Sequence, residues 1–213
     1  MNVIAFVTQK GGTGKSSLAV AAEEQGIKTS IIDLDPQGTA KNWYERRTSE
    51  GGPEVNTISA NQLEAAMPLL NKQGVQLVII DTPGVDTPAA TAAIQVSNLC
   101  LIPARPSIAD IEAAAPTVRS ITRLGKPFSY VLNQCPPGRS IRTNDAFRVL
   151  QLSGAVASTP LAMRADHMDA LATGQGVTER DTNSKAAAEV RELLQWALIK
   201  MKGKKHGQET RVA

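Results

Sequence analysis

Two lysines, three glycines and three hydroxyl side chains lie within nine residues near the start of the chain, Gln9-Lys-Gly-Gly-Thr-Gly-Lys-Ser-Ser17. An apolar run of strand length, 2–8, precedes them, and an alanine-rich helical segment follows. Glycines let successive backbone N–H groups turn toward phosphate oxygens, and a helix N-terminus adds the positive end of its dipole. Lys15 can reach β- and γ-phosphates, and the Ser16 hydroxyl is placed to ligate Mg²⁺. The stretch therefore predicts a phosphate site rather than a plain glycine turn.

Carboxylates follow two further apolar runs. The strand predicted over 30–34 leads into Asp33-Leu-Asp-Pro-Gln37, and the strand over 75–81 ends in Asp81-Thr-Pro-Gly84. Asp33 and Asp35 occupy alternate positions, so they share one face and could hold the waters of a metal or orient an attacking water. A simple turn begun by Asp and Pro is the alternative. Asp81 can reach Mg²⁺, usually through a water, and 82–84 is a switch-like loop that could sense a γ-phosphate.

The glycine-rich stretch departs from the strict P-loop pattern, because Gln9 stands where that pattern has its first glycine. Lys10 to Ser16 resembles the deviant Walker A loop of the ParA/MinD family, in which an extra lysine opens the loop. The two acidic motifs resemble further motifs of the same family. This resemblance implies ATP and Mg²⁺ as cofactors. It assigns nucleotide binding to Lys10, Gly11, Gly12, Thr13, Gly14, Lys15, Ser16 and Ser17.

The resemblance also implies roles in catalysis. Ser16 and Asp81 would hold Mg²⁺, Lys15 would bind phosphates, and Asp35 would position the attacking water. Lys10 would cross a face-to-face homodimer and touch the partner's ATP, stabilising charge as an arginine finger does. Arg105 is either a further cross-subunit contact or a solvated loop charge, and the solvated charge is favoured.

The residues expected to bind the nucleotide base lie in a later part of the chain. Asn133 ends the strand predicted over 128–133, and its amide suits an adenine edge, although an Asn that opens a turn is equally consistent with the pattern. The resemblance favours adenine. It also places Pro160, in the segment 160–176, beside the base. His167 has no second histidine at ligand spacing, so a surface position is predicted rather than a metal ligand.

Strands alternate with helices through most of the 213 residues, which predicts one α/β domain with a doubly wound, mostly parallel sheet and helices on both faces. The domain is expected over 1–201, with a short final strand at 154–158, a last helix over 183–201 and a basic, flexible tail over 202–213. The first crossover helix, 17–25, is about one turn shorter than the family leads us to expect. A helix of this length can only just cross back over a short strand, so the sequence leaves the packing of the first crossover open.

The overall composition is unremarkable for a soluble enzyme. The net charge is only +3, and the two cysteines, Cys100 and Cys135, are far apart in apolar contexts, as expected of buried thiols in a reduced cytosol. No apolar run is long enough to span a bilayer, and the first strand starts at the N-terminus without a signal-type segment. A cytoplasmic, nucleoid-associated protein is expected.

Together these features predict an ATPase that resembles the short, plasmid-type ParA partition proteins. It would dimerise with ATP, bind non-specific DNA and hydrolyse slowly until a centromere-binding or adaptor protein stimulates it. The DNA candidates are basic residues of the last helix and tail: Arg191, Lys200, Lys202, Lys204 and Lys205. These charges could instead form a solvated face. A MinD-like membrane contact is disfavoured because only Val212 after Met201 is bulky and apolar.

Two other classes share the scaffold. An ATP-dependent ligase of the dethiobiotin synthetase type would use the same phosphate loop on a small molecule, but Lys10 and the element 33–37 favour the partition ATPase. An iron–sulfur carrier resembling nitrogenase reductase is disfavoured, because Cys100 falls inside a predicted strand. The cargo and the stimulating partner are not visible in the sequence.

Overall fold

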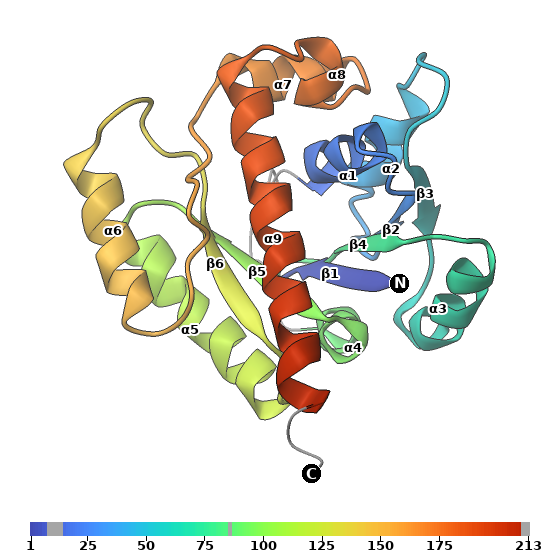
Figure 1. Ribbon diagram of the computed structural model, residues 1–213, viewed down its shortest axis with the longest axis horizontal. Helices are drawn as coiled ribbons and strands as arrows, with labels where there is room; N and C mark the ends of the chain where they lie inside the picture. The colour runs from blue at the N-terminus through green and yellow to red at the C-terminus, as the bar shows by residue number, and fades with distance from the viewer. Residues whose placement is uncertain (8–14, 85–86, 210–213) are drawn as a thin grey trace.

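A six-stranded sheet forms the centre of the computed structural model, which describes residues 1–7, 15–84 and 87–209, the last seven by backbone only (Figure 1). The strand order is β3-β2-β4-β1-β5-β6, and every neighbouring pair is parallel, as the sequence predicts. The strands are β1 (Asn2–Phe6), β2 (Thr29–Asp33), β3 (Glu54–Thr57), β4 (Leu77–Asp81), β5 (Leu99–Ala104) and β6 (Phe128–Leu132).

Helices cover both faces of this sheet (Figure 1). One face packs against α1 (Lys15–Glu24), α2 (Thr39–Glu45), α7 (Ala165–Ala172), α8 (Val177–Arg180) and α9 (Lys185–Glu209). The other packs against α3 (Leu63–Lys72), α4 (Pro88–Val96), α5 (Ile108–Arg123) and α6 (Ile141–Gln151). A 3₁₀ turn, η1 (Ala60–Gln62), precedes α3.

Side-chain alternation along the strands builds the two cores. In β4, Leu77 and Ile79 enter the core beneath α1 and α9, whereas Val78 and Ile80 enter the core beneath α3 to α6. Successive side chains of a strand point to opposite faces, so strands covered on both faces read as continuous apolar runs. The doubly wound architecture predicted from the sequence is confirmed.

The short first crossover fits this sheet. Helix α1 has ten residues and ends before Gly26, whose φ of +72° is the left-handed conformation expected at a helix C-terminus. Ten helical residues rise about 15 Å, close to the length of about 16 Å of a five-residue strand such as β2. The first crossover therefore packs back without strain.

Two expected elements differ from the structure. The strand predicted over 154–158 does not form; this segment makes only an isolated bridge between Tyr130 and Val156. The predicted last helix is longer than expected, because α9 continues past Met201 to Glu209, into the segment expected to be a tail. Among the described residues, none of the helices combines the length and apolar composition needed to cross a bilayer.

The insertion of β4 between β1 and β2 decides where the site lies. Phe6 and Asp33 are each in register with Asp81, so three strands end side by side. Hydrogen bonds link these ends: the Thr82 hydroxyl donates to the Phe6 carbonyl at 2.9 Å, and the Leu34 N–H donates to the Asp81 carbonyl at 3.0 Å. Ligands of open parallel sheets bind outside such carboxyl ends.

Candidate nucleotide site

A buried ion pair marks the centre of the site. Lys15 opens α1, Asp81 closes β4, and the lysine Nζ lies 2.5 Å from the Asp81 Oδ2. Both side chains are less than a tenth exposed. Burial raises the pKa of Asp81 to about 6, while the charge and hydrogen bond of Lys15 act to lower it. The structure thus brings together two residues that the sequence assigned to phosphate and metal.

Asp33 and Asp35 have different hydrogen-bonding roles, which their positions on the strand did not distinguish. The fully buried Asp33 accepts hydrogen bonds from the backbone N–H groups of Asp35, Ala40 and Lys41 at 3.0–3.1 Å. It therefore fixes the turn and supplies acceptors for the first N–H groups of α2. Asp35 is half-buried, and from the described residues its carboxylate accepts one hydrogen bond, from the Gln37 N–H at 3.0 Å. Of the two carboxylates, Asp35 is the one with acceptor capacity left for a ligand.

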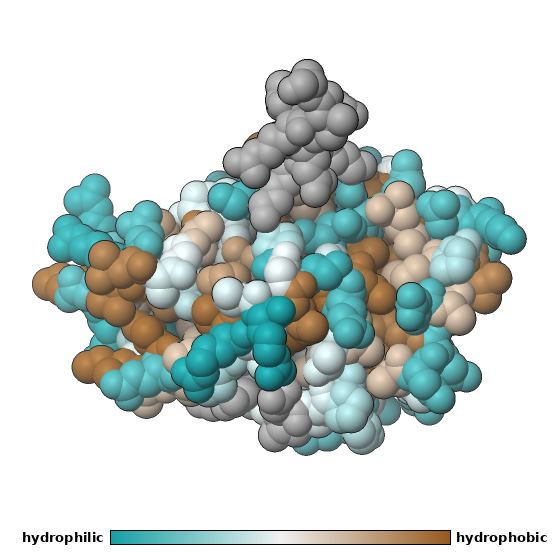
Figure 2. All heavy atoms as spheres, turned by 90° about the horizontal axis from the view of Figure 1, so that it is seen from below, coloured by the Kyte–Doolittle hydropathy of each residue, from teal (hydrophilic) through white to brown (hydrophobic). Residues whose placement is uncertain are grey.

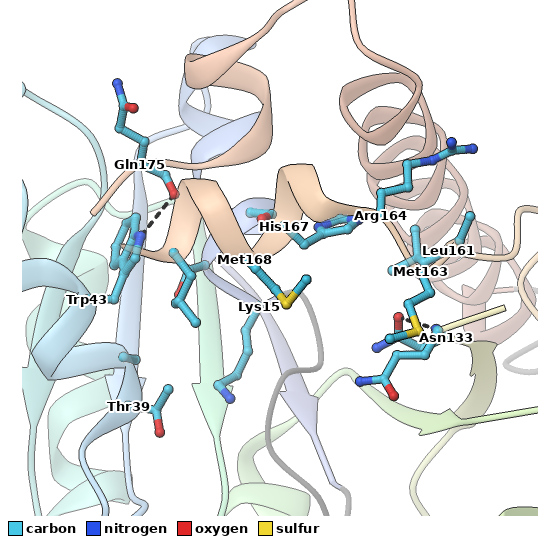
Figure 3. A pocket seen from close by; sticks show the side chains of 16 residues that line it. Lys15, Thr39, Trp43, Asn133, Leu161, Met163, Arg164, His167, Met168 and Gln175 are labelled. Atoms are coloured by element: carbon cyan, nitrogen blue, oxygen red, sulfur yellow. Dashed lines mark hydrogen bonds between the residues drawn. The ribbon is translucent and has the colours of Figure 1, made fainter. Parts of the chain in front are cut away.

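A cavity of about 220 Å³ adjoins the ion pair (Figure 3). Lys15, Ser16 and Ser17 line it at the start of α1, and Asn133 and Gln134 line it where β6 ends. The remaining wall comes from α2 and from the segment that carries α7: Thr39, Ala40, Trp43, Leu161, Ala162, Met163, Arg164, His167, Met168, Leu171 and Gln175. The cavity therefore has a polar phosphate end and a largely apolar far end.

Asn133 lies in the cavity wall, as expected of an adenine candidate, and it also makes a local turn. Its Oδ1 accepts the Gln134 N–H at 2.7 Å, and Gln134 has a φ of +52°, the only non-glycine value in the left-handed region among the described residues. The two readings of Asn133 are therefore compatible. Pro160 is half-buried and is not among the cavity residues, whereas the adjacent Leu161 is.

The structure moves His167 from the surface, where the sequence placed it, into the cavity wall (Figure 3). Its Nε2 is buried and has no hydrogen-bond partner in the described part of the chain. Burial lowers the pKa of His167, and Glu189 and Asp166 act in the opposite direction. The neutral imidazole is consequently favoured.

Long-range contacts hold the far wall in place. The indole N–H of the fully buried Trp43 donates to the Gln175 carbonyl at 3.0 Å. The Arg47 guanidinium lies 5.0 Å from the Trp43 ring centroid and pairs with both carboxylate oxygens of Glu179, at 2.7 and 3.0 Å. On the other side Arg164 pairs with Glu189 of α9. Residues about 130 positions apart thus form one wall.

Two glycines let this wall pack closely. Gly174 has a φ of +69°, and a Cβ built on it would lie 2.5 Å from the Arg47 backbone nitrogen. A Cβ on Gly176 would lie 2.7 Å from the Cβ of Val20 in α1. Because these contacts involve backbone and a β-branched side chain, any larger residue would push α7 and α8 away from the cavity.

The predicted DNA residues whose side chains are described differ in their surroundings. Arg191 donates to the Thr182 carbonyl and hydroxyl at 2.7 and 2.6 Å and pairs with Glu24 at 3.3 Å. The Lys200 ammonium lies 5.9 Å from the Trp196 ring centroid, and Lys202 is exposed. The side chains of Lys204 and Lys205 lie outside the described residues. Arg191 is therefore engaged by Thr182 and Glu24, although its side chain remains partly exposed.

Most of the glycine-rich loop, including Lys10, Gly11, Gly12, Thr13 and Gly14, lies outside the described residues. At its end, Ser16 and Asp81 offer the hard oxygen donors that suit Mg²⁺. The described residues contain no group of three or more His, Cys, Asp or Glu side chains that could enclose a metal by themselves. This donor set fits a Mg²⁺ ion that takes its other ligands from phosphates and water.

Comparison with known proteins identifies the family. Residues 1–151 match the AAA domain family. The chain belongs to this family. Within it, the chain is 25% identical over 202 residues to maintenance of carboxysome distribution protein A of Halothiobacillus neapolitanus, covering 90% of this chain and 94% of that one. The same-named protein of Gloeobacter kilaueensis is 30% identical over 157 residues, covering 71% and 72%.

Solved structures of ParA and MinD proteins share the fold of this AAA-domain chain. A putative plasmid partition protein of Borrelia burgdorferi bound to AMPPNP matches with a TM-score of 0.74 at 16% identity, covering 93% of this chain and 99% of that one. MinD of Pyrococcus horikoshii complexed with Mg-ADP matches with a TM-score of 0.71 at 17% identity, covering 91% and 94%. These structures confirm the predicted fold class. The resemblance to ParA/MinD-type ATPases is confirmed together with the AAA domain match and the curated relatives, and the predicted cofactors match the nucleotide and metal ligands of these structures.

Proposed function

We propose that the chain is a Mg²⁺-dependent ATPase that dimerises with ATP and positions DNA or another large cargo through nucleotide-gated binding to non-specific DNA. The observation that carries the proposal is the buried Lys15–Asp81 pair beside Ser16 at the polar end of the cavity. With nucleotide bound, a phosphate would pair with the Lys15 ammonium and a divalent cation would pair with the Asp81 carboxylate. Each side chain would then exchange its present partner for a ligand of opposite charge. The names of the relatives, which refer to carboxysome distribution and plasmid partition, support a positioning role.

Each residue at the phosphate end has a separate role in this proposal. Lys15 binds the β- and γ-phosphates, Ser16 and Asp81 hold Mg²⁺, and Asp35 orients the attacking water. Bound Mg²⁺ would neutralise charge that develops on the phosphates. Lys10 would reach the ATP of the second subunit and stabilise charge there. The adenine edge would be read by the amide of Asn133.

DNA binding is assigned to the basic end of α9. Because the Arg191 guanidinium is occupied by Thr182 and Glu24, the proposal rests on Lys200, Lys202, Lys204 and Lys205. Figure 1 shows that this end of α9 points away from α7, which lines the cavity. A DNA-bound dimer would be associated with the nucleoid, and a centromere-binding or adaptor protein would stimulate its hydrolysis.

Sedimentation velocity tests the nucleotide switch. The protein is run with Mg²⁺ and ATP, with Mg²⁺ and ADP, and without nucleotide, alongside an Asp35→Ala variant that should retain ATP. We expect a dimer with ATP only, and a longer-lived dimer for Asp35→Ala. A monomer that ignores nucleotide would refute the proposal and favour the small-molecule ligase.

Co-sedimentation with a non-specific duplex tests the DNA step. Reversal of Lys200, Lys202, Lys204 and Lys205 to Glu should abolish ATP-dependent DNA binding and spare ATP binding, because these residues lie far along α9 from the cavity. Reversal of Arg119 and Arg123, which are exposed on α5, is the matched control. DNA affinity that is unchanged by the lysine reversals would refute this assignment, and binding to anionic vesicles instead would favour the membrane alternative.

A further inference from the structure

Helix α6 presents large aliphatic side chains to solvent at one end of the molecule. It lies beside β6, the last strand of the sheet order, and its inner face buries Thr143, Ala146 and Leu150. On its outer side Ile141 is 82% exposed, Leu152 is 89% exposed and Val149 is 49% exposed. Single exposed aliphatics are ordinary on protein surfaces, but three on an eleven-residue helix and its C-cap are a concentration.

Helix geometry places the ends of this surface in line. Ile141 and Leu152 are eleven positions apart, which is three helical turns, so they lie on one side of α6 about 16 Å from each other. Arg148 occupies the same line between them. A partner that covers both ends must therefore run along the helix.

Positive charge surrounds these aliphatic side chains. Arg139, Arg142 and Arg148 are exposed, and the first two form no ion pair or hydrogen bond within the described part of the chain. Arg148 has a single distant partner, Asp145 at 3.9 Å, and both side chains are largely exposed. Asp145 is the one acid between 139 and 152. Figure 2 likewise shows hydrophobic and hydrophilic side chains side by side at the left, the side on which α5 and α6 lie.

We propose that this surface, the α6 face (Arg139, Ile141, Arg142, Arg148, Val149 and Leu152), docks an acidic amphipathic helical segment of another protein. Apolar side chains of that segment would cover Ile141 and Leu152, and its carboxylates would pair with the arginines. Interfaces draw their binding energy from anchors of this kind, arginines and large apolar side chains that become desolvated together. The proposal does not depend on the ATPase assignment.

Other occupants fit these observations less well. A DNA backbone would match the arginines but would leave the exposed aliphatics without a counterpart. A second copy of α6 would bring the same arginines toward one another in a two-fold contact. A bilayer surface requires a broad apolar helix face, and α6 packs its own apolar face against the protein core.

Fluorescence anisotropy with a designed probe tests the α6 face. The probe is a labelled 16-residue peptide rich in Glu, with leucines on one helical face; a peptide of the same composition with leucines spread over all faces is its control. We expect saturable binding of the amphipathic peptide and binding at least about tenfold weaker for the control. Absence of saturable binding up to about 1 mM, or equal binding of both peptides, overturns the proposal.

Matched variants assign the contact to α6. Reversal of Arg139, Arg142 and Arg148 to Glu should weaken peptide binding at least about tenfold, and Ile141→Ser with Leu152→Ser should weaken it by a similar factor that added salt does not reduce. Reversal of Arg119 and Arg123 on α5 should change it less than about twofold. An equal effect of the α5 reversals overturns the proposal. If a combined variant fails to fold, Leu152→Ser alone, at the most exposed of these positions, makes the same test.

Three further measurements distinguish the other possible occupants of the α6 face, which are DNA, a membrane and a second copy of the chain. A 20-base-pair duplex, phosphatidylglycerol vesicles and sedimentation equilibrium of the protein alone are each compared between the wild type and Leu152→Ser. We expect no difference in any of them. Loss of self-association, of vesicle binding or of duplex binding in Leu152→Ser would assign the surface to that occupant and overturn the proposal.

Discussion

The two ends of the cavity are built in different ways. At the phosphate end, Asp33 and Asp81 end neighbouring strands of the sheet, and Lys15 begins helix α1. A buried ion pair and backbone N–H groups hold these side chains. At the far end, Trp43 and Arg47 of the α2 region meet Gln175 and Glu179, about 130 positions later. The first end follows from parallel strands, and the second depends on long-range packing.

This difference separates chemistry from stability. Substitutions at the phosphate end remove charges that a nucleotide needs, whereas substitutions at the far end leave buried polar groups without partners. The first kind should therefore change activity in a folded protein, and the second should change the free energy of unfolding.

The largest expected effect is that of Arg47→Ala. Its side chain is only 4% exposed and pairs with Glu179, so its removal leaves a mostly buried carboxylate unpaired. Breaking such a pair costs about 3 kcal/mol. The adjacent Arg46 is exposed and, among the residues that the structure describes, donates to the Leu171 carbonyl alone, so Arg46→Ala should cost less than about 1 kcal/mol. Urea unfolding measures both losses of free energy, provided that the dependence of the free energy on urea concentration is the same in all variants. Equal losses for Arg47→Ala and Arg46→Ala would contradict the comparison.

A slightly smaller effect, confined to activity, is expected for Lys15→Met. Removing the lysine that faces the phosphates should slow ATP hydrolysis about 100-fold, equivalent to about 2.7 kcal/mol. The methionine fills similar space. Burial already raises the pKa of Asp81 to about 6, and without Lys15 this carboxyl takes up a proton, so no buried charge is left unpaired and the fold is kept. Lys28→Met, at an exposed position far from the cavity residues, is the control. Phosphate release measures the rates. A Lys15→Met protein with the wild-type rate would show that the phosphate end is misassigned.

The smallest expected effect concerns pH. Because burial lowers the pKa of His167 below its usual 6.5, the folded state binds fewer protons than the unfolded state in this range. Its contribution to stability is therefore present above pH 6.5 and is lost as the pH falls toward the lower folded value. The raised pKa of Asp81 acts in the opposite direction, but it is common to the wild type and His167→Gln.

The midpoints of urea unfolding of the wild type and of His167→Gln, each measured at pH 7.5 and 5.5, separate the contribution of His167 to stability from that of other groups. The wild type should lose more stability on acidification than His167→Gln does. Identical losses would show that His167 is not buried as neutral imidazole in the far wall.

The sequence alone predicted the doubly wound parallel sheet, and it assigned Lys15 to phosphate and Asp81 to Mg²⁺, two residues that the structure brings together. Each is tied to a strand end or helix start, and apolar runs and glycines mark these in the sequence. Local hydrogen bonds were harder to predict. The strand pattern alone gave Asp33 and Asp35 the same possible roles, and only the family resemblance chose Asp35, whereas in the structure the start of α2 occupies the Asp33 carboxylate. The extent of α9 was also missed, because a basic, glycine-containing segment reads as a tail.

Tertiary structure alone decided the far wall and the use of the arginines. No short spacing relates Trp43 to Gln175 or Arg47 to Glu179, since such contacts arise only when α7 and α8 pack on α2, and Gly174 and Gly176 permit that approach. His167 lines the cavity because the segment that carries α7 packs there, and Arg191 pairs with Glu24 because α9 packs on α1. Periodicity in a sequence determines which face of an element is buried, but the partner of a polar side chain is decided by which elements the folded chain brings against it.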